Sequence, residues 1–265
     1  GGQNVTVNTT GGDVLVGENY AGDGNTPVTG AVVVNNTFGG VTKDNVNVMG
    51  GTTVNITTSA SRDNSINVGL PDLPLQNAGG TALLTSGSGS IADDPTGNVS
   101  IYDATVWSNG TTTYGTESFG VSTNGGTSVS ITGGDGHDNF VWDDQSTILN
   151  ATGLAAGPGT LANVSLTGVN GITEIGSDVL ANLTVNNSDW FLGRIFDDTA
   201  NAAITVNLAN DGHVHLQDEF GQMGFTGPAP FIGSFVVNAT GASPEVLTID
   251  ASGATLADAA TEANA

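Results

Sequence analysis

The sequence predicts an all-β protein, and a β-solenoid is the architecture that we expect first. Three observations support this expectation. Short segments alternate between apolar, mostly β-branched residues and Thr, Asn or Ser, which is the pattern of strands that bury one face. Gly, Asn and Asp separate these segments and supply turns that tolerate a positive φ angle. A short motif also recurs along the chain, as in proteins built from stacked repeats.

The recurring motif consists of two glycines, two polar residues and an alternating Val-x-Val or Val-x-Ile segment. Its copies begin at residues 1, 50 and 125 and read GGQNVTVNTT, GGTTVNITTS and GGTSVSITGG. The similarity extends upstream, because VNVMGG at Val46–Gly51 corresponds to VSTNGG at Val121–Gly126. A second unit recurs as GAVVVNNT at Gly30 and GNVSIYDA at Gly97. We therefore expect one β-rich repeat region over residues 1–150. The chain begins at a repeat boundary, and with Gly rather than Met, so we expect it to be a piece of a longer array.

Residues 151–265 are expected to form a second, β-solenoid-like region with a short C-terminal helix at Ala254–Ala263. Several strand-like segments in this region are separated by about one solenoid rung of roughly 20 to 30 residues. For residues 1–150 the alternative is a tandem array of Ig-like β-sandwiches, because sandwich loops accommodate inserts of very different length. The strand-like segments of the second region are Ala162–Val169, Val179–Asn187, Ala202–Asn210, His213–Gln217, Gly233–Thr240 and Glu245–Ser252.

The charge balance limits the partners of this protein. Lys and Arg together number 3 against 26 Asp and Glu, so the formal net charge is −23. Nucleic acid and anionic lipid are poor partners for such a surface, whereas cations are favourable ones. No apolar run approaches the roughly 20 residues of a membrane-spanning helix, and no secretory signal is present. Cysteine is absent, which excludes disulfides and thiolate metal sites and fits export without oxidative folding.

One stretch, ITGGDGHDNFVWDD at Ile131–Asp144, is unusually rich in Gly and Asp. Within it, Gly133–Val141 matches G-G-x-G-x-D-x-U-x, the calcium-binding nonapeptide of the RTX proteins. The chain here resembles this family of large proteins exported by type I secretion. Glycines let backbone carbonyls turn toward a shared cation, and Ca²⁺ accepts six to eight oxygen ligands in a flexible geometry. This stretch is the candidate calcium site.

The resemblance implies specific roles for the residues of the nonapeptide. Asp138 would be the side-chain ligand, and Phe140 would point inward to hold the rung. Main-chain or carboxylate oxygen would come from Gly134, Asp135 and Gly136.

The chain departs from the family pattern in one respect. In that family calcium lies between two stacked turns, whereas this chain has one full copy of the motif. The repeat alignment places TSASRDNSI at Thr58–Ile66 in the equivalent position, where Asp63 remains but the glycines do not. An ordinary turn formed by Gly and Asp is the alternative to a calcium site.

Two further patterns are candidates for metal binding or catalysis. His213 and His215 lie two apart on an expected strand, so both rings would face one side, with Asp211 or Asp218 nearby. Such a pair can hold a transition metal, or it can be two solvated histidines. Paired acidic residues could be glycosidase carboxylates, although solvation or calcium binding is the simpler expectation. These pairs are Asp93–Asp94, Asp143–Asp144, Asp197–Asp198 and Asp218–Glu219.

Asn-x-Ser/Thr sequons are frequent in this chain. They are glycosylation acceptors on many exported proteins, but alternating strands rich in Asn and Thr also place these residues two apart without any such role. The sequon asparagines are Asn4, Asn8, Asn35, Asn55, Asn98, Asn109, Asn150, Asn163, Asn182, Asn186 and Asn238.

In composition and repeats the chain resembles repeat-rich bacterial surface proteins: S-layer proteins, type I-secreted adhesins and subunits of extracellular filaments. The resemblance implies a structural, non-enzymatic protein at the cell surface or outside the cell, which assembles with copies of itself and is stabilised by calcium. An adhesin module that binds a cell-surface glycan or a surface protein is the alternative. A polysaccharide-active enzyme is the remote one, because Lys and Arg are too few to neutralise an anionic polysaccharide.

Overall fold

The computed structural model of the chain describes fifteen separate stretches. They are residues 2–17, 26–37, 45–58, 65–69, 94–103, 119–133, 138–143, 159–169, 171–177, 179–188, 191–196, 202–210, 213–218, 232–240 and 246–250.

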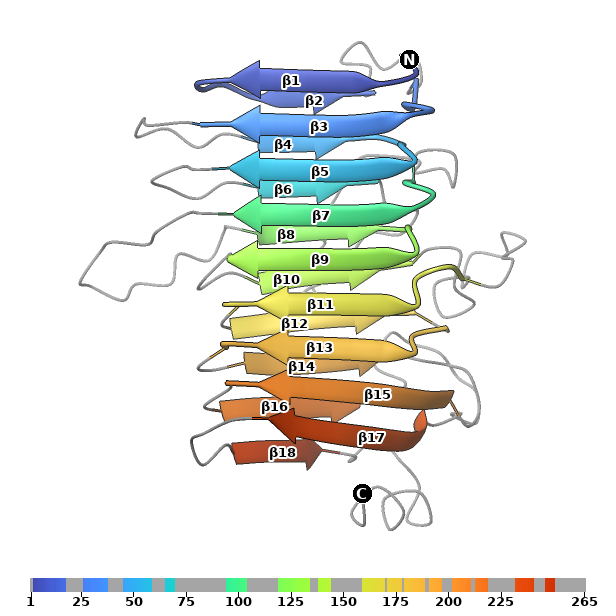
Figure 1. Cartoon of the computed structure of the whole chain (residues 1–265), viewed down its shortest axis with the longest axis vertical. Helices are drawn as coiled ribbons and strands as arrows, with labels where there is room; N and C mark the ends of the chain where they lie inside the picture. Colours follow the sequence, from blue (N-terminus) through green and yellow to red (C-terminus); the bar gives the residue numbers. More distant parts are fainter. Residues whose placement is uncertain are drawn as a thin grey trace, which may run out of the picture.

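These stretches form eighteen strands in two sheets of nine (Figure 1). Odd-numbered strands make one sheet, the odd sheet, and even-numbered strands make the other, the even sheet. The odd sheet contains β1 (Val5–Thr9), β3 (Ala31–Asn36), β5 (Thr53–Thr58), β7 (Asn98–Asp103), β9 (Ser128–Gly133), β11 (Asn163–Thr167), β13 (Asn182–Asn186), β15 (Ala202–Ala209) and β17 (Ile232–Thr240). The even sheet contains β2 (Val14–Val16), β4 (Asn45–Val48), β6 (Ser65–Val68), β8 (Phe119–Asn124), β10 (Asp138–Trp142), β12 (Gly171–Gly176), β14 (Phe191–Phe196), β16 (His213–Asp218) and β18 (Val246–Asp250).

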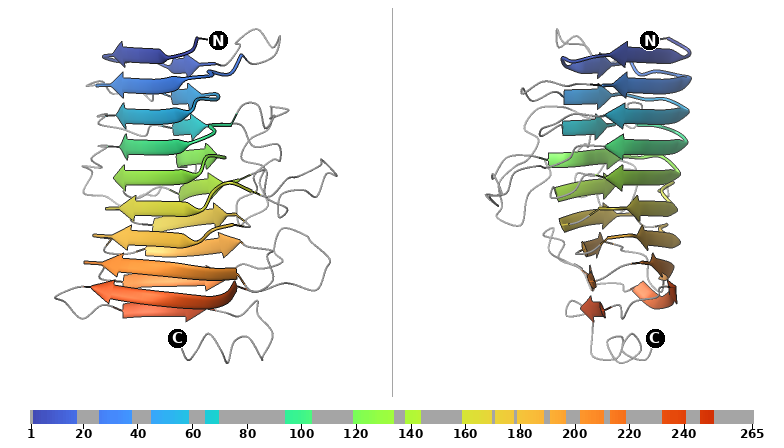
Figure 2. Two further views of the ribbon diagram at one scale, coloured as in Figure 1. Left: turned by 45° about the vertical axis from the view of Figure 1, so that its right-hand side comes forward. Right: turned by 60° about the vertical axis from the view of Figure 1, so that its left-hand side comes forward.

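The strands of each sheet are parallel and stack in chain order, so each odd strand and the even strand after it make one rung. The protein is therefore all-β, with parallel strands in two stacked sheets, an arrangement compatible with a β-solenoid (Figure 2). Ig-like sandwiches are built from antiparallel sheets. The parallel pairing throughout the described part of residues 1–150 shows that the Ig-like alternative is wrong.

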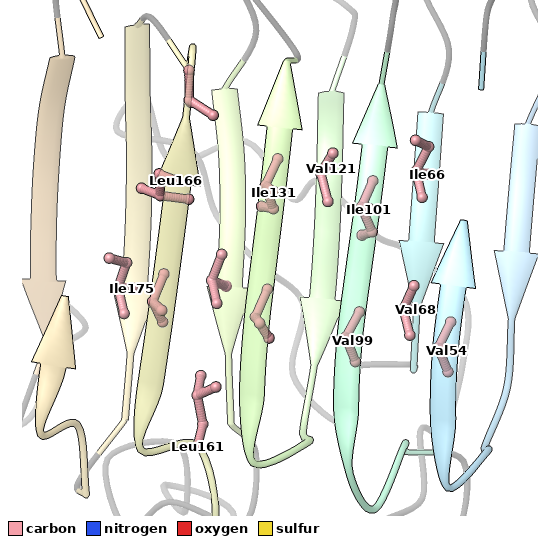
Figure 3. Packing of buried hydrophobic residues seen from close by; sticks show 14 of the residues in the cluster. Val54, Ile66, Val68, Val99, Ile101, Val121, Ile131, Leu161, Leu166 and Ile175 are labelled. Carbon is pink, nitrogen blue, oxygen red and sulfur yellow. The ribbon is translucent and has the colours of Figure 1, made fainter. Parts of the chain in front are cut away.

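The core lies between the two sheets (Figure 3). Inward positions of the odd strands form two apolar columns that continue from rung to rung, because period-two alternation sends every second side chain inward. Residues in register along one column are Val5, Val32, Val54, Val99, Val129, Val164, Leu183, Val206 and Val237. The interior members of this column are at most 1% exposed.

The repeats seen in the sequence correspond to alternate rungs. The three copies of the Gly-Gly motif contain β1, β5 and β9, whereas the second repeat unit forms β3 and β7, which lie between them. The two upstream segments form β4 and β8 of the even sheet. In residues 1–150 the odd sheet thus alternates between two types of strand, and both are predicted as strands.

Glycine directly precedes two odd strands, β3 and β7, because the backbone of the preceding rung passes too close for a side chain. A Cβ atom placed on Gly30 would lie 1.4 Å from the carbonyl oxygen of Gln3, and one on Gly97 would lie 2.1 Å from that of Thr52. Real Cβ atoms essentially never approach an atom within 3.0 Å. The first glycine of the second repeat unit is therefore required by packing between rungs.

Rungs of very different length keep the same register. Val54 pairs with Val99 after a long stretch of chain, whereas Val164 pairs with Leu183 after a much shorter stretch that contains β12. Both sheets also continue across residue 150, since β9 pairs with β11 and β10 with β12. The division into two regions stays a prediction.

The second region matches its predicted strands in part. All six predicted segments contain a strand, but β12 and β14 were not predicted. The helix expected at Ala254–Ala263 lies outside the described residues. Within the described stretches, no helix has the length and apolar character required to cross a membrane.

Candidate functional site

The predicted calcium turn connects β9 to β10. β9 ends at Gly133 and β10 begins at Asp138, so the turn joins the two sheets within one rung. Three of the predicted ligands, Gly134, Asp135 and Gly136, lie outside the described residues. Asp138 is the first residue of β10, in register with Phe119 of the neighbouring rung. The described stretches contain no group of three or more His, Cys, Asp or Glu residues suited to a metal ion, and calcium binding stays a prediction.

Phe140 does not point into the core between the sheets. Its neighbour Val141 belongs to that core, so the alternation of the strand turns Phe140 and Trp142 to the outer face of the even sheet. Phe140 is nevertheless buried there, at 3% exposure, in register with Ser122 and Glu174. The nonapeptide pattern therefore predicts a buried Phe140 correctly but assigns it to the wrong face.

The middle of the even sheet is buried on both faces. Along β8, β10 and β12 the described residues directed away from the core are about as inaccessible as those directed into it. Trp142 packs on Gly176 of the next rung, where a Cβ atom would lie 2.3 Å from the indole ring. Outward residues that are buried in this area are Ser122, Asn124, Phe140, Trp142 and Glu174.

Two residues of the acidic pairs considered as glycosidase carboxylates, Asp143 and Asp94, have structural roles at the corner between the even and odd sheets. The fully buried Asp143 accepts hydrogen bonds on its Oδ2 from the backbone N–H groups of Thr160, at 2.5 Å, and Leu161, at 2.8 Å. Asp143 thereby ties the end of β10 to the residues that lead into β11. Asp94 is 3% exposed and accepts a hydrogen bond on Oδ1 from Asn124 Nδ2 at 3.2 Å. A catalytic role for the acidic pairs stays a prediction.

The predicted histidine pair lies on β16, which begins at His213. Val214 and Leu216 belong to the core, so the alternation of the strand turns His215 to the outer face of the even sheet. Nε2 of His215 is buried without a hydrogen-bond partner. Asp211 lies outside the described residues, and Asp218 ends β16. A metal at this pair stays a prediction.

The outer face of the odd sheet is a continuous surface without charge. Every outward position of its described strands carries Thr, Ser, Asn, Ala, Val or Tyr. Those whose exposure the structure describes are Thr6 and Asn8; Ala31, Val33 and Asn35; Thr53, Asn55 and Thr57; Asn98, Ser100 and Tyr102; Ser128, Ser130 and Thr132; Asn163, Ser165 and Thr167; Asn182, Thr184 and Asn186; Ala203, Thr205, Asn207 and Ala209; and Val236, Asn238 and Thr240. We call this surface the neutral face.

Amide ladders connect neighbouring rungs on the neutral face. Nδ2 of Asn35 donates to Oδ1 of Asn8 at 2.8 Å, and Nδ2 of Asn182 donates to Oδ1 of Asn163 at 2.8 Å. Sequons contribute the asparagines of both pairs. The described sequons lie on the neutral face or, for Asn4, immediately before β1, and glycosylation of them stays a prediction.

Both sheets end in edges without a partner strand among the described residues. β1 and β2 lie at one end of the stack, and β17 and β18 lie at the other (Figure 1). Three core-facing residues on the end strands of the odd sheet are only partly buried: Val5 and Val7 at one end and Val237 at the other. Their counterparts in the interior rungs are almost inaccessible.

No protein-family model, curated protein or solved structure matches the chain. The function must therefore be inferred from the edges, the faces and the charge of the molecule itself.

Proposed function

We propose that this chain is a structural building block of an extracellular or cell-surface assembly, and that its copies join end to end through the free edges of their sheets. The observation that carries the proposal is the incomplete burial of Val5, Val7 and Val237 at the two ends of an otherwise closed core. A further rung on either end, from another copy or from the next repeat of a longer parent chain, would bury them, and burial of apolar surface is favourable by roughly 25 cal/mol per Å².

The two ends are complementary in their backbone hydrogen bonding. Successive peptide groups of a strand point to opposite sides, and the N–H of Thr37 donates to the carbonyl of Thr9 at 3.0 Å. In β1, therefore, Val5, Val7 and Thr9 bond toward β3, whereas the peptide groups of Thr6 and Asn8 point off the free edge.

At the other end, in β17, the inward residues rather than the outward ones direct their peptide groups off the free edge. The N–H of Asn187 donates to the carbonyl of Ala209 at 2.8 Å, so outward residues of the odd strands bond toward the preceding rung and inward residues bond toward the next. In β17 the inward residues Val237 and Ala239 thus direct their peptide groups off the free edge. These groups match those that Thr6 and Asn8 present on another copy.

The side chains of the two ends are also compatible with each other. Continuation of the register would place Val5 next to Val237 in the apolar column and Thr6 next to Asn238 on the neutral face. Because all strands are parallel, one copy follows another by translation and rotation along the stack. This contact is heterologous and does not close, so it produces filaments.

The extracellular setting and the role of calcium rest on composition and on the RTX-like turn. A surface of net charge −23 repels other copies unless cations screen it, and calcium bound at Asp138 would add local positive charge. Coupling of assembly to calcium would restrict it to the calcium-rich exterior of cells. An adhesin module that binds a glycan or a surface protein is the second candidate, and it predicts a chain that stays monomeric.

The decisive experiment is electron microscopy of the purified chain in millimolar calcium and in excess chelator. Thr6→Pro removes an N–H that points off the edge and leaves the bonds of β1 to β3 intact, so we expect it to stop filament growth. Thr6→Val is the matched control because it keeps this N–H, and circular dichroism checks that both variants fold. Filaments that form equally well with Thr6→Pro would contradict the proposal, as would single particles of the unaltered chain in both solutions.

A further inference from the structure

We infer that the neutral face is a lateral docking surface for the same face of a second copy of this chain, so that assemblies contain pairs of stacks lying face to face. This inference deepens the proposed self-assembly by naming a second contact. The centre of the neutral face, on β9 and β11, takes no part in the end-to-end contact, so the two contacts can fail or succeed separately.

The distribution of charge is the first observation. The chain has 26 acidic residues, yet no outward position of the described odd strands carries a charge. The acidic residues of the described strands lie in the even sheet, as Asp138, Glu174, Asp218 and Asp250 do, or at the end of an odd strand, as Asp103 does. Exposed sheet faces of soluble proteins normally carry charged residues that oppose association. This face lacks that protection.

The charge of the rest of the molecule selects the neutral face for contact between copies. Two chains of net charge −23 repel each other, and like charges brought into an interface cost several kcal/mol. Glu174 of the even sheet is directed away from the core, so contact through the neutral face keeps its carboxylate on the far side of each copy. At physiological salt the Debye length is about 8 Å, which is less than the roughly 10 Å thickness of one sheet-on-sheet layer.

The shape of the face suits a flat partner. Its residues are small, apart from Tyr102, which is 50% exposed, and the apolar Val236 is 52% exposed. Amide ladders such as that from Asn238 Nδ2 to Asn207 Oδ1, at 2.9 Å, hold the side chains in rows that follow the rungs. Rows of small polar side chains on two sheets can interdigitate and exclude water, as they do where paired sheets of identical segments meet.

The area is sufficient for a stable dimer. Nine strands spaced about 4.8 Å apart, each contributing about five residues at roughly 3.3 Å, give a face of about 700 Å². Typical specific interfaces bury about 800 Å² on each partner. A face-to-face contact of two identical surfaces is isologous and closes after two copies. Lateral pairing therefore adds one partner to each chain and does not by itself extend the filament.

The test uses the edge-blocked Thr6→Pro chain, whose oligomeric state is then independent of end-to-end growth. We expect sedimentation equilibrium at physiological salt to show a monomer–dimer equilibrium. Ser130→Glu with Ser165→Glu places two charges at the middle of the face and should weaken the dimer at least about tenfold. Leu15→Glu is the matched control, because Leu15 is exposed on the outer face of the even sheet, and it should leave the dimer unchanged.

A spectroscopic measurement locates the contact. The chain contains no cysteine, so Ser130→Cys provides a single attachment site for a nitroxide label. Ser130 lies on β9, the fifth of the nine odd strands, and we expect strong dipolar broadening between labels there and none from Leu15→Cys.

The possible outcomes separate the two contacts. A Thr6→Pro chain that stays monomeric at millimolar concentration overturns lateral pairing but leaves end-to-end growth untouched. A dimer that the two Glu substitutions do not weaken also overturns it, because the contact then lies elsewhere. Dimers of the unaltered chain without any filament would support lateral pairing and contradict the proposed function. A monomer that binds a neutral polysaccharide through this face would replace the second copy with a glycan as its occupant.

Discussion

Gly97 offers a direct test of how neighbouring rungs pack. It precedes β7 at the corner between the sheets, and its backbone carbonyl accepts a hydrogen bond from the N–H of Thr127 at 3.0 Å. Substitution by Ala would place a Cβ atom 2.1 Å from the carbonyl oxygen of Thr52. A carbon atom and an oxygen atom that are not bonded approach each other to no less than about 3.3 Å, so the two rungs must separate by roughly 1 Å at this corner.

The cost follows from what this separation breaks. One backbone hydrogen bond joins these two rungs at this corner, from the N–H of Thr96 to the carbonyl of Gly51 at 2.9 Å. Its loss costs about 1 kcal/mol, and overpacking of a tight contact adds about 1 to 3 kcal/mol. We therefore expect Gly97→Ala to lower the free energy of unfolding by about 2 to 4 kcal/mol.

Gly168→Ala is the control because it isolates the effect of backbone conformation. Gly168 has a φ of +66°, and a Cβ atom there would meet no other atom within 4 Å, so Ala at this position is strained but does not clash. The expected cost is about 1 kcal/mol. Urea denaturation followed by circular dichroism gives both values, and hydrogen exchange shows whether the loosened amides lie in the rungs around β7. A Gly97→Ala protein within about 0.5 kcal/mol of the unaltered chain, or one more stable than Gly168→Ala, would refute the reasoning.

Three other predictions concern the core, the corner and the predicted cation site. Ile131→Ala in the core should cost about 3 to 4 kcal/mol in urea denaturation, whereas Thr132→Ala on the neutral face should change stability by less than about 0.5 kcal/mol; equal effects would contradict the assignment of faces. Asp143→Ala leaves two backbone N–H groups without their acceptor and should lower the stability by about 3 kcal/mol, whereas Asp143→Asn should lower it less. If thermal denaturation shows Asp143→Asn to be the less stable of the two variants, the hydrogen bonds of Asp143 do not hold this corner together. Millimolar calcium should raise the melting temperature of the unaltered chain but not of Asp138→Asn, and an equal rise in both would remove Asp138 from the calcium site.

Alternation made the odd sheet predictable from the sequence. Its strands bury one face and expose the other, so Val-x-Val segments with Thr or Asn between them signal both the strand and its orientation. The repeats also indicated which segments are equivalent, and the register of β1, β5 and β9 agrees with that equivalence.

Parts of the even sheet were harder to predict for a physical reason. Strands buried on both faces need not alternate, and β12, GITEIG, has buried residues on both of its sides. The same property explains the error at Phe140, since a buried aromatic residue does not reveal which face buries it. Asp143 could not be assigned either, because its partners Thr160 and Leu161 lie across an intervening segment and are brought near only by the stacking of rungs.

The agreement in register between rungs of unequal length means that contour length and axial length are independent in this protein. Each rung advances the stack by one strand spacing of about 4.8 Å, whether the chain returns to the same column after few residues, as from Val164 to Leu183, or after many, as from Val54 to Val99. The spacing of the rungs along the stack is thus fixed by backbone hydrogen bonds. Peptides could be inserted at its corners without changing its length, which would allow sequences to be displayed along one side at a spacing set in advance.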